Sequence, residues 1–476
     1  MSQYLHMPCQ ATLNQLVNIV HSTQFNWPTT GLDDPSTGIT TDTRTMEPGQ
    51  IFVALRGHHF DGHHFIQQAA QGGAKAAIVD QQWEIKGSSI PFLQVADTLA
   101  AYQAIAHWWR GQFQIPIIAI TGSVGKTTTK ELVAAVLATT SGNPHSSPHW
   151  VLKTQANYNN EIGVPQTLLK LDAHHRYAVI EMGMRGSGEV ALLAQIARPT
   201  MALITNVGTA HLERLGSEEA IARAECETLL ELNADGVAIL NHDDARLMNT
   251  AAQFWQGTTL TFGLNGGDLH GELLSQDRLR VGDYCFPLPL PGRHNGLNYL
   301  AALSVIQVLG MDWTPLQSGL KVHLPGGRAR RYETAGDILL LDETYNAGVE
   351  SMIATLHLLS QTPGIRRIAV LGTMKELGPR SVEFHQRVGE TVAQLGLDYL
   401  LVLADEPEAS AFMKGAQKVP SQWFTRHDQL IHYLIGTVKA GDRLLFKASR
   451  SIGMDRVVDG LRQYLDKANI SHGKDV

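Results

Sequence analysis

The chain has 476 residues, of which 43% are hydrophobic and 17% charged, and it carries a formal net charge of −7. This length fits about three domains, and the negative charge gives no electrostatic basis for nucleic acid or an anionic membrane as the main partner. The three cysteines, Cys9, Cys226 and Cys285, match neither a disulfide framework nor a zinc spacing. No segment resembles a signal peptide or reaches the roughly 18 apolar residues of a membrane span. We therefore expect a monomeric cytoplasmic protein.

The first stretch, residues 1–112, predicts strands at 49–55 and 74–80 and a helix at 65–74 that ends in glycines. The histidines of "GHHFDGHHF" (57–65) are open to two interpretations. They are either solvent-facing loop residues or metal ligands. We favour the loop interpretation because no acidic or cysteine partner stands at ligand spacing.

The second and third stretches, 113–326 and 327–476, alternate short apolar runs with helical segments. Strands are predicted at 115–121, 176–183, 200–208, 236–241, 337–343, 366–372, 399–404 and 442–449, and helices at 127–140 and 217–233. The segment "PLPLPGRHN" (287–295) is predicted to be a loop. This alternation indicates an α/β fold with mostly parallel sheets that are covered on both faces.

The segment "TGSVGKTTTKE" (121–131) predicts a phosphate-binding loop between a strand and a helix. Gly122 and Gly125 allow backbone N–H groups to approach a polyphosphate, Lys126 would reach its β and γ oxygens, and Thr127 would bind Mg²⁺. The usual pattern has a further glycine where this chain has Ile120. The alternative is a plain glycine turn that leads into a helix, which the surrounding strand and helix pattern disfavours.

Two further residues are ambiguous when taken alone. Glu181 ends a predicted strand, where a carboxylate can hold the Mg²⁺ of a nucleotide or simply face solvent. His211 follows another strand, but Mg²⁺ prefers oxygen ligands, and a lone histidine is more often a satisfied polar group.

Taken in order, "TGSVGKTTTKE", "EMG" (181–183), "NVGTAHLERLGS" (206–217) and "GRHN" (292–295) resemble the Mur ligases, ATP-dependent amide-forming enzymes of peptidoglycan synthesis. Folylpolyglutamate synthetase and cyanophycin synthetase are relatives. The altered phosphate loop is the usual form in that superfamily. The segments 42–66, 157–169, 339–352, 370–378 and 445–458 are most similar to the member that adds a dipeptide.

The resemblance implies three domains and a reaction. Residues 1–112 would bind the UDP-sugar, 113–326 would bind ATP and Mg²⁺ on a mostly parallel sheet, and 327–476 would form a Rossmann-like domain that binds D-alanyl-D-alanine and closes on ATP. The enzyme would phosphorylate the C-terminal carboxylate of UDP-N-acetylmuramoyl-tripeptide, and the dipeptide amine would then displace phosphate.

The resemblance also assigns roles to residues. Those at the ATP would be Gly122, Ser123, Val124, Gly125, Lys126, Thr127, Thr128, Asn295, Arg328, Asp342 and Glu343. Lys126, Glu181, His211 and Glu225 would be catalytic, and Thr127, Glu181, His211 and Glu225 would serve the metal sites. Thr43, Arg44 and Asn160 would contact the UDP-sugar and its peptide. Tyr345, Asn346, Lys447, Ser449 and Arg450 would lie by D-alanyl-D-alanine. The alternatives are a helix cap for Asn295 and ordinary surface charges for Arg328, Lys447 and Arg450.

The sequence departs from the family in three places. Family members commonly carry a carbamylated lysine by the second Mg²⁺, and the matching residue here is Glu225. Our hypothesis is that Glu225 supplies that carboxylate directly, and the alternative is a solvent-facing helix residue beside a degraded site. The frequent aspartate pair is Asp342-Glu343 here, and "YNAGVESM" stands where "YNANPDSM" is frequent.

Two other functions compete with this interpretation. A sister ligase would add a single amino acid, but the "DNPR" motif common in the diaminopimelate-adding enzyme is absent from the sequence. A protein that uses nucleotide only as a conformational switch would bind ATP without substrate-dependent release of phosphate.

Overall fold

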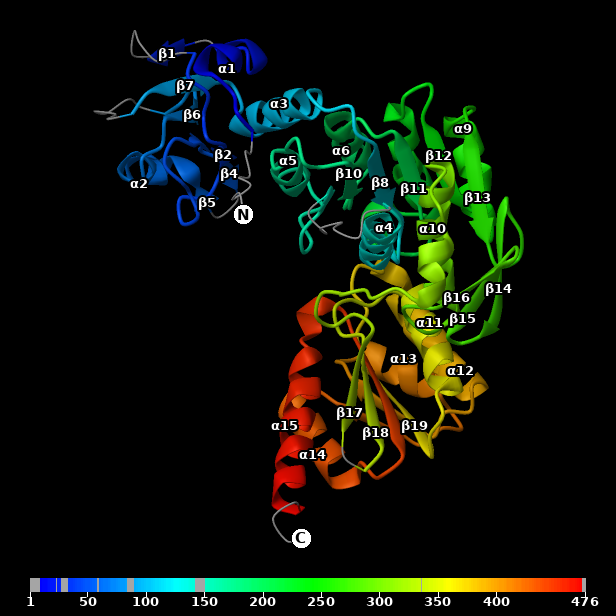
Figure 1. Ribbon diagram of the computed structural model, residues 1–476. Helices are drawn as coiled ribbons and strands as arrows, with labels where there is room; N and C mark the ends of the chain where they lie inside the picture. Colours follow the sequence, from blue (N-terminus) through cyan, green and yellow to red (C-terminus); the bar gives the residue numbers. More distant parts are fainter. Residues whose placement is uncertain are drawn as a thin grey trace.

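The structure is a computed structural model that describes residues 9–22, 24–26, 33–57, 60–83, 90–141, 150–334 and 336–472, with side chains up to residue 467. Within these residues three α/β units follow one another along the chain, blue, green, and yellow to red in Figure 1. Each unit contains a sheet of mostly parallel strands. The predicted α/β fold class is confirmed.

The first unit has the strand order β1-β7-β6-β3-β2 over its described part, and only β1 runs antiparallel to its neighbour. Its elements are α1 (Leu13–Ile19), β1 (Gln24–Asn26), β2 (Ile39–Thr40), β3 (Ile51–Val53), β4 (Arg56–Gly57), β5 (Phe60–Asp61), η1 (Gly62–Phe65), α2 (Ile66–Gln71), β6 (Ala76–Asp80), β7 (Phe92–Val95) and α3 (Thr98–Arg110). Helix α3 leads from this unit toward the middle one (Figure 1).

The solvent-facing prediction for the histidines is wrong for His63. Its ring is buried, with Nδ1 at 2.6 Å from Asp61 Oδ1, and its Nε2 accepts from the backbone N–H of Asp80 at 3.0 Å. His63 therefore ties η1 to β6 through both ring nitrogens. His64 is exposed, and His58 and His59 lie outside the described residues.

The middle unit has the strand order β16-β15-β14-β13-β12-β11-β8-β10-β9 among described residues. Its elements are β8 (Ile117–Thr121), α4 (Lys126–Thr140), β9 (Val151–Lys153), α5 (Gly163–Leu168), β10 (Tyr177–Glu181), α6 (Glu189–Ala197), β11 (Met201–Ile204), α7 (Leu212–Leu215), α8 (Glu218–Cys226), η3 (Glu227–Glu231), β12 (Val237–Asn241), α9 (Ala245–Phe254), β13 (Thr259–Gly263), β14 (Leu269–Ser275), β15 (Arg278–Val281), β16 (Tyr284–Pro287), α10 (Arg293–Val308) and η4 (Thr314–Ser318).

Two sequence predictions in the middle unit need correction. Strands β14, β15 and β16 form an antiparallel extension that we did not predict, because their residues alternate between buried and exposed instead of forming apolar runs. The segment 287–295 is a loop only in its centre, since Pro287 ends β16 and Arg293 begins α10. Pro291 and Gly292 stand directly before the first residue of α10, where both residue types are tolerated.

The third unit has the strand order β17-β18-β22-β19-β20-β21 in the part that the structure describes, with β17 antiparallel to β18. Its elements are β17 (Arg330–Thr334), β18 (Ile338–Asp342), α11 (Val349–Gln361), β19 (Arg366–Gly372), η5 (Gly378–Arg380), α12 (Ser381–Gln394), β20 (Tyr399–Leu403), α13 (Glu408–Gly415), β21 (Ser421–Phe424), α14 (His427–Thr437), β22 (Asp442–Lys447), η6 (Arg450–Ile452) and α15 (Asp455–His472).

Alternation along the central strands shows that the sheets are buried on both faces. In β8, Ile117 and Ala119 enter one hydrophobic core, and Ile118 and Ile120 enter another. One core spans the first and middle units, and a second spans the middle and third units. No helix among the described residues is long and apolar enough to cross a bilayer.

Candidate active site

A cavity of about 710 Å³ lies between the middle and third units. The middle unit contributes the carboxyl-terminal ends of β8, β10 and β11, the segment before α5 and the start of α10. The third unit contributes the loops after β18, β19 and β22. Parallel α/β sheets bind ligands beyond the carboxyl ends of their strands, so two such edges share one candidate site.

The loop between β8 and α4 has the geometry of a phosphate cradle. Gly122 and Gly125 have φ angles of +128° and +87°, which residues with a Cβ rarely adopt. Lys126 begins α4, and its Nζ donates to the carbonyl of Gly122 at 2.5 Å. The amino end of this 15-residue helix presents free N–H groups and the positive end of the helix dipole, which together favour the binding of an anion.

The segment after β11 supports the phosphate loop from behind. Asn206 accepts from the N–H groups of Ser123 and Val124, both at 3.0 Å. The Ser123 hydroxyl in turn accepts from the N–H of Gly208 at 2.8 Å. These hydrogen bonds fix the shape of the loop.

Glu181 faces the phosphate loop from the end of β10. Its Oε1 accepts from the Thr127 hydroxyl at 3.1 Å and from Asn159 Nδ2 at 2.8 Å, whereas its Oε2 is buried without a hydrogen-bond partner. Among the described residues no group of three or more His, Cys, Asp or Glu side chains could hold a metal ion. Mg²⁺ needs only one or two carboxylates beside nucleotide phosphates and water, so the oxygens of Glu181 and Thr127 fit it.

Glu225 lies directly behind the phosphate loop, on α8. It is 1% exposed, and its Oε2 accepts from the Thr121 hydroxyl at 2.5 Å and from the N–H of Gly122 at 2.8 Å. Burial raises the pKa of the Glu225 carboxyl, and the positive charge of Lys126 opposes that rise. Glu225 is therefore neither exposed nor part of the cavity wall, where Glu181 and His211 stand.

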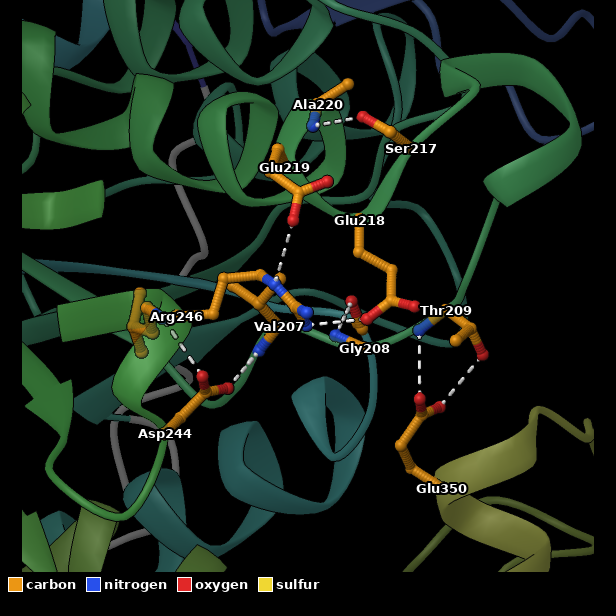
Figure 2. A network of polar contacts seen from close by, with 12 residues as sticks. Val207, Gly208, Thr209, Ser217, Glu218, Glu219, Ala220, Asp244, Arg246 and Glu350 are labelled. Atoms are coloured by element: carbon orange, nitrogen blue, oxygen red, sulfur yellow. Dashed lines mark hydrogen bonds and ion pairs between the residues drawn. The ribbon is translucent and has the colours of Figure 1, made fainter. Parts of the chain in front are cut away.

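The segment between β11 and α7 also contacts the third unit. Glu350 of α11 accepts from the N–H of Thr209 at 3.0 Å and from its hydroxyl at 3.2 Å, as Figure 2 shows. His211 Nδ1 lies 2.5 Å from the Oε2 of Glu376, which follows β19. Burial raises the pKa of Glu350, and its two bonds from Thr209 act in the opposite direction. These contacts join the middle-unit wall of the cavity to the third unit.

On the third-unit wall, Lys447 is the central cation. It is 4% exposed, donates to the carbonyl of Asn346 at 2.9 Å and lies near Glu343. Burial lowers the pKa of Lys447 to about 8, and burial raises that of Glu343. The guanidinium of Arg328 stacks over the Tyr345 ring at 3.9 Å, with its Nε buried and unpartnered.

The structure brings most of the predicted site residues to this one cavity. Those that line it are Ser123, Val124, Gly125, Lys126, Thr127, Thr128, Asn160, Glu181, His211, Asn295, Arg328, Glu343, Tyr345, Asn346, Lys447, Ser449 and Arg450. Those outside its lining are Thr43, Arg44, Gly122, Glu225 and Asp342.

Several predicted residues have structural partners in this conformation. Arg44 makes a bidentate pair with Asp42, and Asn160 accepts from the N–H of Gly163 at 2.9 Å at the start of α5. The Asp342 carboxylate accepts from the Thr344 hydroxyl at 2.6 Å, which leaves Glu343 as the member of the acidic pair on the cavity.

Sequence reasoning missed Asn159, Glu350 and Glu376 on the cavity wall. Asn159 and Glu376 lie within segments whose family resemblance we noted, but no residue-level signal separated them from their neighbours. Glu350 also lies within such a segment, 339–352, but its contact with Thr209, 141 residues away in the chain, could not be read from local sequence.

Three family models match the chain along most of its length. The Mur ligase family catalytic domain matches residues 35–110, the Mur ligase middle domain 120–306, and the Mur ligase glutamate ligase domain 327–450. The chain belongs to the Mur ligase family.

Similar proteins are named as one type of Mur ligase. The UDP-N-acetylmuramoyl-tripeptide–D-alanyl-D-alanine ligase of Synechocystis is 56% identical over 423 residues, covering 89% of this chain and 91% of that protein. The Escherichia coli protein of the same name is 36% identical, covering 95% and 98%. Among solved structures, MurF from Acinetobacter baumannii has a TM-score of 0.85 at 33% identity, covering 96% of this chain and 100% of that one. MurF ligase from Thermotoga maritima in complex with ADP has a TM-score of 0.79 at 31% identity, covering 90% and 98%.

Proposed function

We propose that this chain joins D-alanyl-D-alanine to the C-terminal carboxylate of UDP-N-acetylmuramoyl-tripeptide, with ATP converted to ADP and phosphate. The product is UDP-N-acetylmuramoyl-pentapeptide for peptidoglycan synthesis. The observation that carries the proposal is the shared cavity, in which a phosphate loop and a metal-competent carboxylate face Arg328 and Lys447 of the third unit. The end-to-end similarity to proteins named for this reaction supports it.

The proposed reaction consists of two displacements, the first at the γ-phosphorus of ATP and the second at the carbonyl carbon of the acyl phosphate. The tripeptide carboxylate attacks the γ-phosphorus of ATP, ADP leaves, and the dipeptide amine then attacks the acyl phosphate and expels phosphate. Lys126 and the loop N–H groups screen the phosphate charge that otherwise repels the carboxylate. Mg²⁺, held by Thr127 and Glu181, would supply further screening on the phosphate oxygens. The protein forms no covalent bond itself, so positioning accounts for much of the rate.

In this proposal each of the three units binds a different substrate. Residues 1–112, through Thr43 and Arg44, bind the UDP-sugar, and Asn160 lies along its peptide. Residues 113–326 bind ATP and Mg²⁺, with His211 at the metal and Asn295 at the adenine. Residues 327–476 bind D-alanyl-D-alanine and close on ATP. We propose that the enzyme works as a monomer in the cytoplasm.

Phosphate release tests the proposed function. The purified chain is given ATP, Mg²⁺ and UDP-N-acetylmuramoyl-tripeptide, and then D-alanyl-D-alanine or single amino acids in turn. We expect release and pentapeptide formation only with the dipeptide. Release with a single amino acid on a shorter acceptor would identify a sister ligase, and nucleotide binding without release under any condition would favour a conformational switch.

Lys447 is expected to make dipeptide binding weaken as the pH rises through about 8. Burial lowers the pKa of Lys447 to about 8, so its ammonium, which would attract the dipeptide carboxylate, loses its proton there. A lysine of the unfolded chain keeps its proton to about pH 10.4. Between these values the unfolded chain binds more protons, so the contribution of Lys447 to stability rises with pH while its contribution to binding falls.

The measurement is KM for D-alanyl-D-alanine between pH 7 and 10. The dipeptide amine also titrates near pH 8, and it raises KM in every variant. The informative quantity is therefore the additional rise in KM that wild type shows over Lys447→Arg, because arginine keeps its charge over this pH range. Lys439→Arg, at an exposed position outside the cavity lining, should behave as wild type. Superimposable profiles for wild type and Lys447→Arg would contradict the assignment.

Glu225→Gln is expected to lower kcat by about 10²-fold if the Glu225 charge serves the metal and phosphate site. Glutamine can still accept a hydrogen bond from Thr121 or Gly122, so a purely structural role would leave kcat within a few fold of wild type. Wild-type activity should not depend on added bicarbonate, because no lysine has to be carbamylated. Glu219→Gln, with an exposed side chain on the same helix, is the control. A strong bicarbonate requirement would contradict the hypothesis.

A further inference from the structure

A buried lysine lies beneath the phosphate loop and has no role in the chemistry above. Lys130 is one turn along α4 from Thr127, so both side chains lie on the helix face that packs on β10. The Lys130 side chain is 0% exposed, and its Nζ is close to two carboxylates without an aligned hydrogen bond to either. Burying an ammonium is costly unless opposite charge compensates it, so its surroundings must be explained.

Those surroundings form a line of alternating charges from the protein surface to the cavity. Lys153 on β9 is 42% exposed and pairs with Glu131, and Glu131 Oε1 is 3.1 Å from Lys130 Nζ. On its other side, Lys130 Nζ is 3.5 Å from Glu181 Oε2. The four formal charges cancel.

The two oxygens of Glu181 are in different environments. Oε1 accepts two hydrogen bonds and faces Thr127, whereas the buried Oε2 accepts none and has the Lys130 ammonium as its neighbour. The Lys130 ammonium thus lies beside the Glu181 oxygen that accepts no hydrogen bond. A cation reaching Glu181 from the cavity meets a carboxylate whose charge is already offset from within the protein.

We propose that Lys130 is the built-in counter-ion of Glu181, a positioning residue that orients this carboxylate and weakens its affinity for a free divalent cation. The cation then binds well only together with nucleotide phosphates, whose negative charge compensates for the positive charge of Lys130. The effect on cation binding rests on the metal role of Glu181 proposed above, whereas the pairing itself does not.

Mn²⁺ titration followed by electron paramagnetic resonance, without nucleotide, tests the effect on the cation. Lys130→Met should bind Mn²⁺ about tenfold more tightly than wild type, because a positive charge close to the site is removed. Lys153→Met removes the same charge at the half-exposed outer end and should change the affinity by less than about twofold. Equal affinities for wild type and Lys130→Met would overturn the proposal.

Chemical unfolding of Glu181→Gln in metal-free buffer tests the pairing, even if Lys130→Met does not fold. If Glu181 had no counter-ion, its replacement by neutral glutamine would remove an uncompensated buried charge. Glu181→Gln would then be at least as stable as wild type. If Glu181 is paired with Lys130, Glu181→Gln leaves the buried ammonium without this partner. The equilibrium constant for unfolding should then be at least tenfold larger in Glu181→Gln than in wild type. Unchanged or increased stability would overturn the proposal. If Glu181→Gln binds Mn²⁺ as wild type does, the metal role of Glu181 fails, and the unfolding result still decides the pairing.

Discussion

Replacement of Lys126 by alanine is expected to lower kcat by about 10³-fold. Lys126 is the first residue of α4, and its Nζ now donates to the Gly122 carbonyl within the phosphate loop. Nucleotide phosphates are the stronger acceptor, so the ammonium would turn toward them and stabilise the charge that develops during phosphoryl transfer. Alanine leaves that charge to the backbone N–H groups and to the proposed Mg²⁺.

Steady-state kinetics with the dipeptide, together with calorimetric binding of ADP and ATP, measure this effect. The loss should fall mainly on kcat, because a group that acts on the transferred phosphoryl contributes most in the transition state. Lys414→Ala, at an exposed position of α13 outside the cavity lining, serves as the matched control. A Lys126→Ala enzyme within tenfold of the wild-type kcat would refute the role.

Gly122→Ala is expected to abolish measurable ligase activity. A Cβ at Gly122 would stand 2.2 Å from the Thr205 hydroxyl oxygen and 3.0 Å from the backbone of Asn206, and the φ angle of +128° is itself unfavourable for alanine. The loop must therefore move away from β11, which takes its N–H groups and Lys126 out of alignment. A misplacement of about 1 Å can cost about 10²-fold in rate.

The control for backbone strain alone is Gly310→Ala. Gly310 has a φ angle of +63°, an added Cβ there meets nothing within 4 Å, and the residue lies outside the cavity lining. We expect that variant to lose about 1–2 kcal/mol of stability and to keep wild-type kcat. ATP binding by calorimetry and thermal unfolding separate the two variants, and wild-type affinity in Gly122→Ala would show that the loop tolerates the displacement.

The parts of the molecule that local sequence determines were predicted well. The loop between β8 and α4 follows from glycines, a lysine and a helix-forming run in immediate succession, and β19 occupies the residues predicted for it, Arg366–Gly372. These buried parallel strands are continuous apolar runs, which a single sequence reveals. The family resemblance then supplied residues such as Asn295 and Lys447, which periodicity alone would have left unassigned.

The parts that depend on distant pairing were not predicted. The antiparallel strands β14–β16 are half exposed and carry charged residues, so they lack the apolar run of a buried strand. Lys130 has the appearance of an ordinary charge on a helix, and only the packing of α4 against β10 buries it beside Glu181. The contact between Thr209 and Glu350 depends on how two units meet, which no local pattern encodes.

The segment from Val207 to His211 has a thermodynamic consequence. It touches the phosphate loop through Gly208 and Ser123, and it touches the third unit through Thr209 and His211. In the proposed function, a ligand that shifts the third unit would act on the nucleotide pocket through these contacts, and linkage would make the influence reciprocal. Whatever factor nucleotide adds to the affinity for the amine donor, the donor must return the same factor to nucleotide.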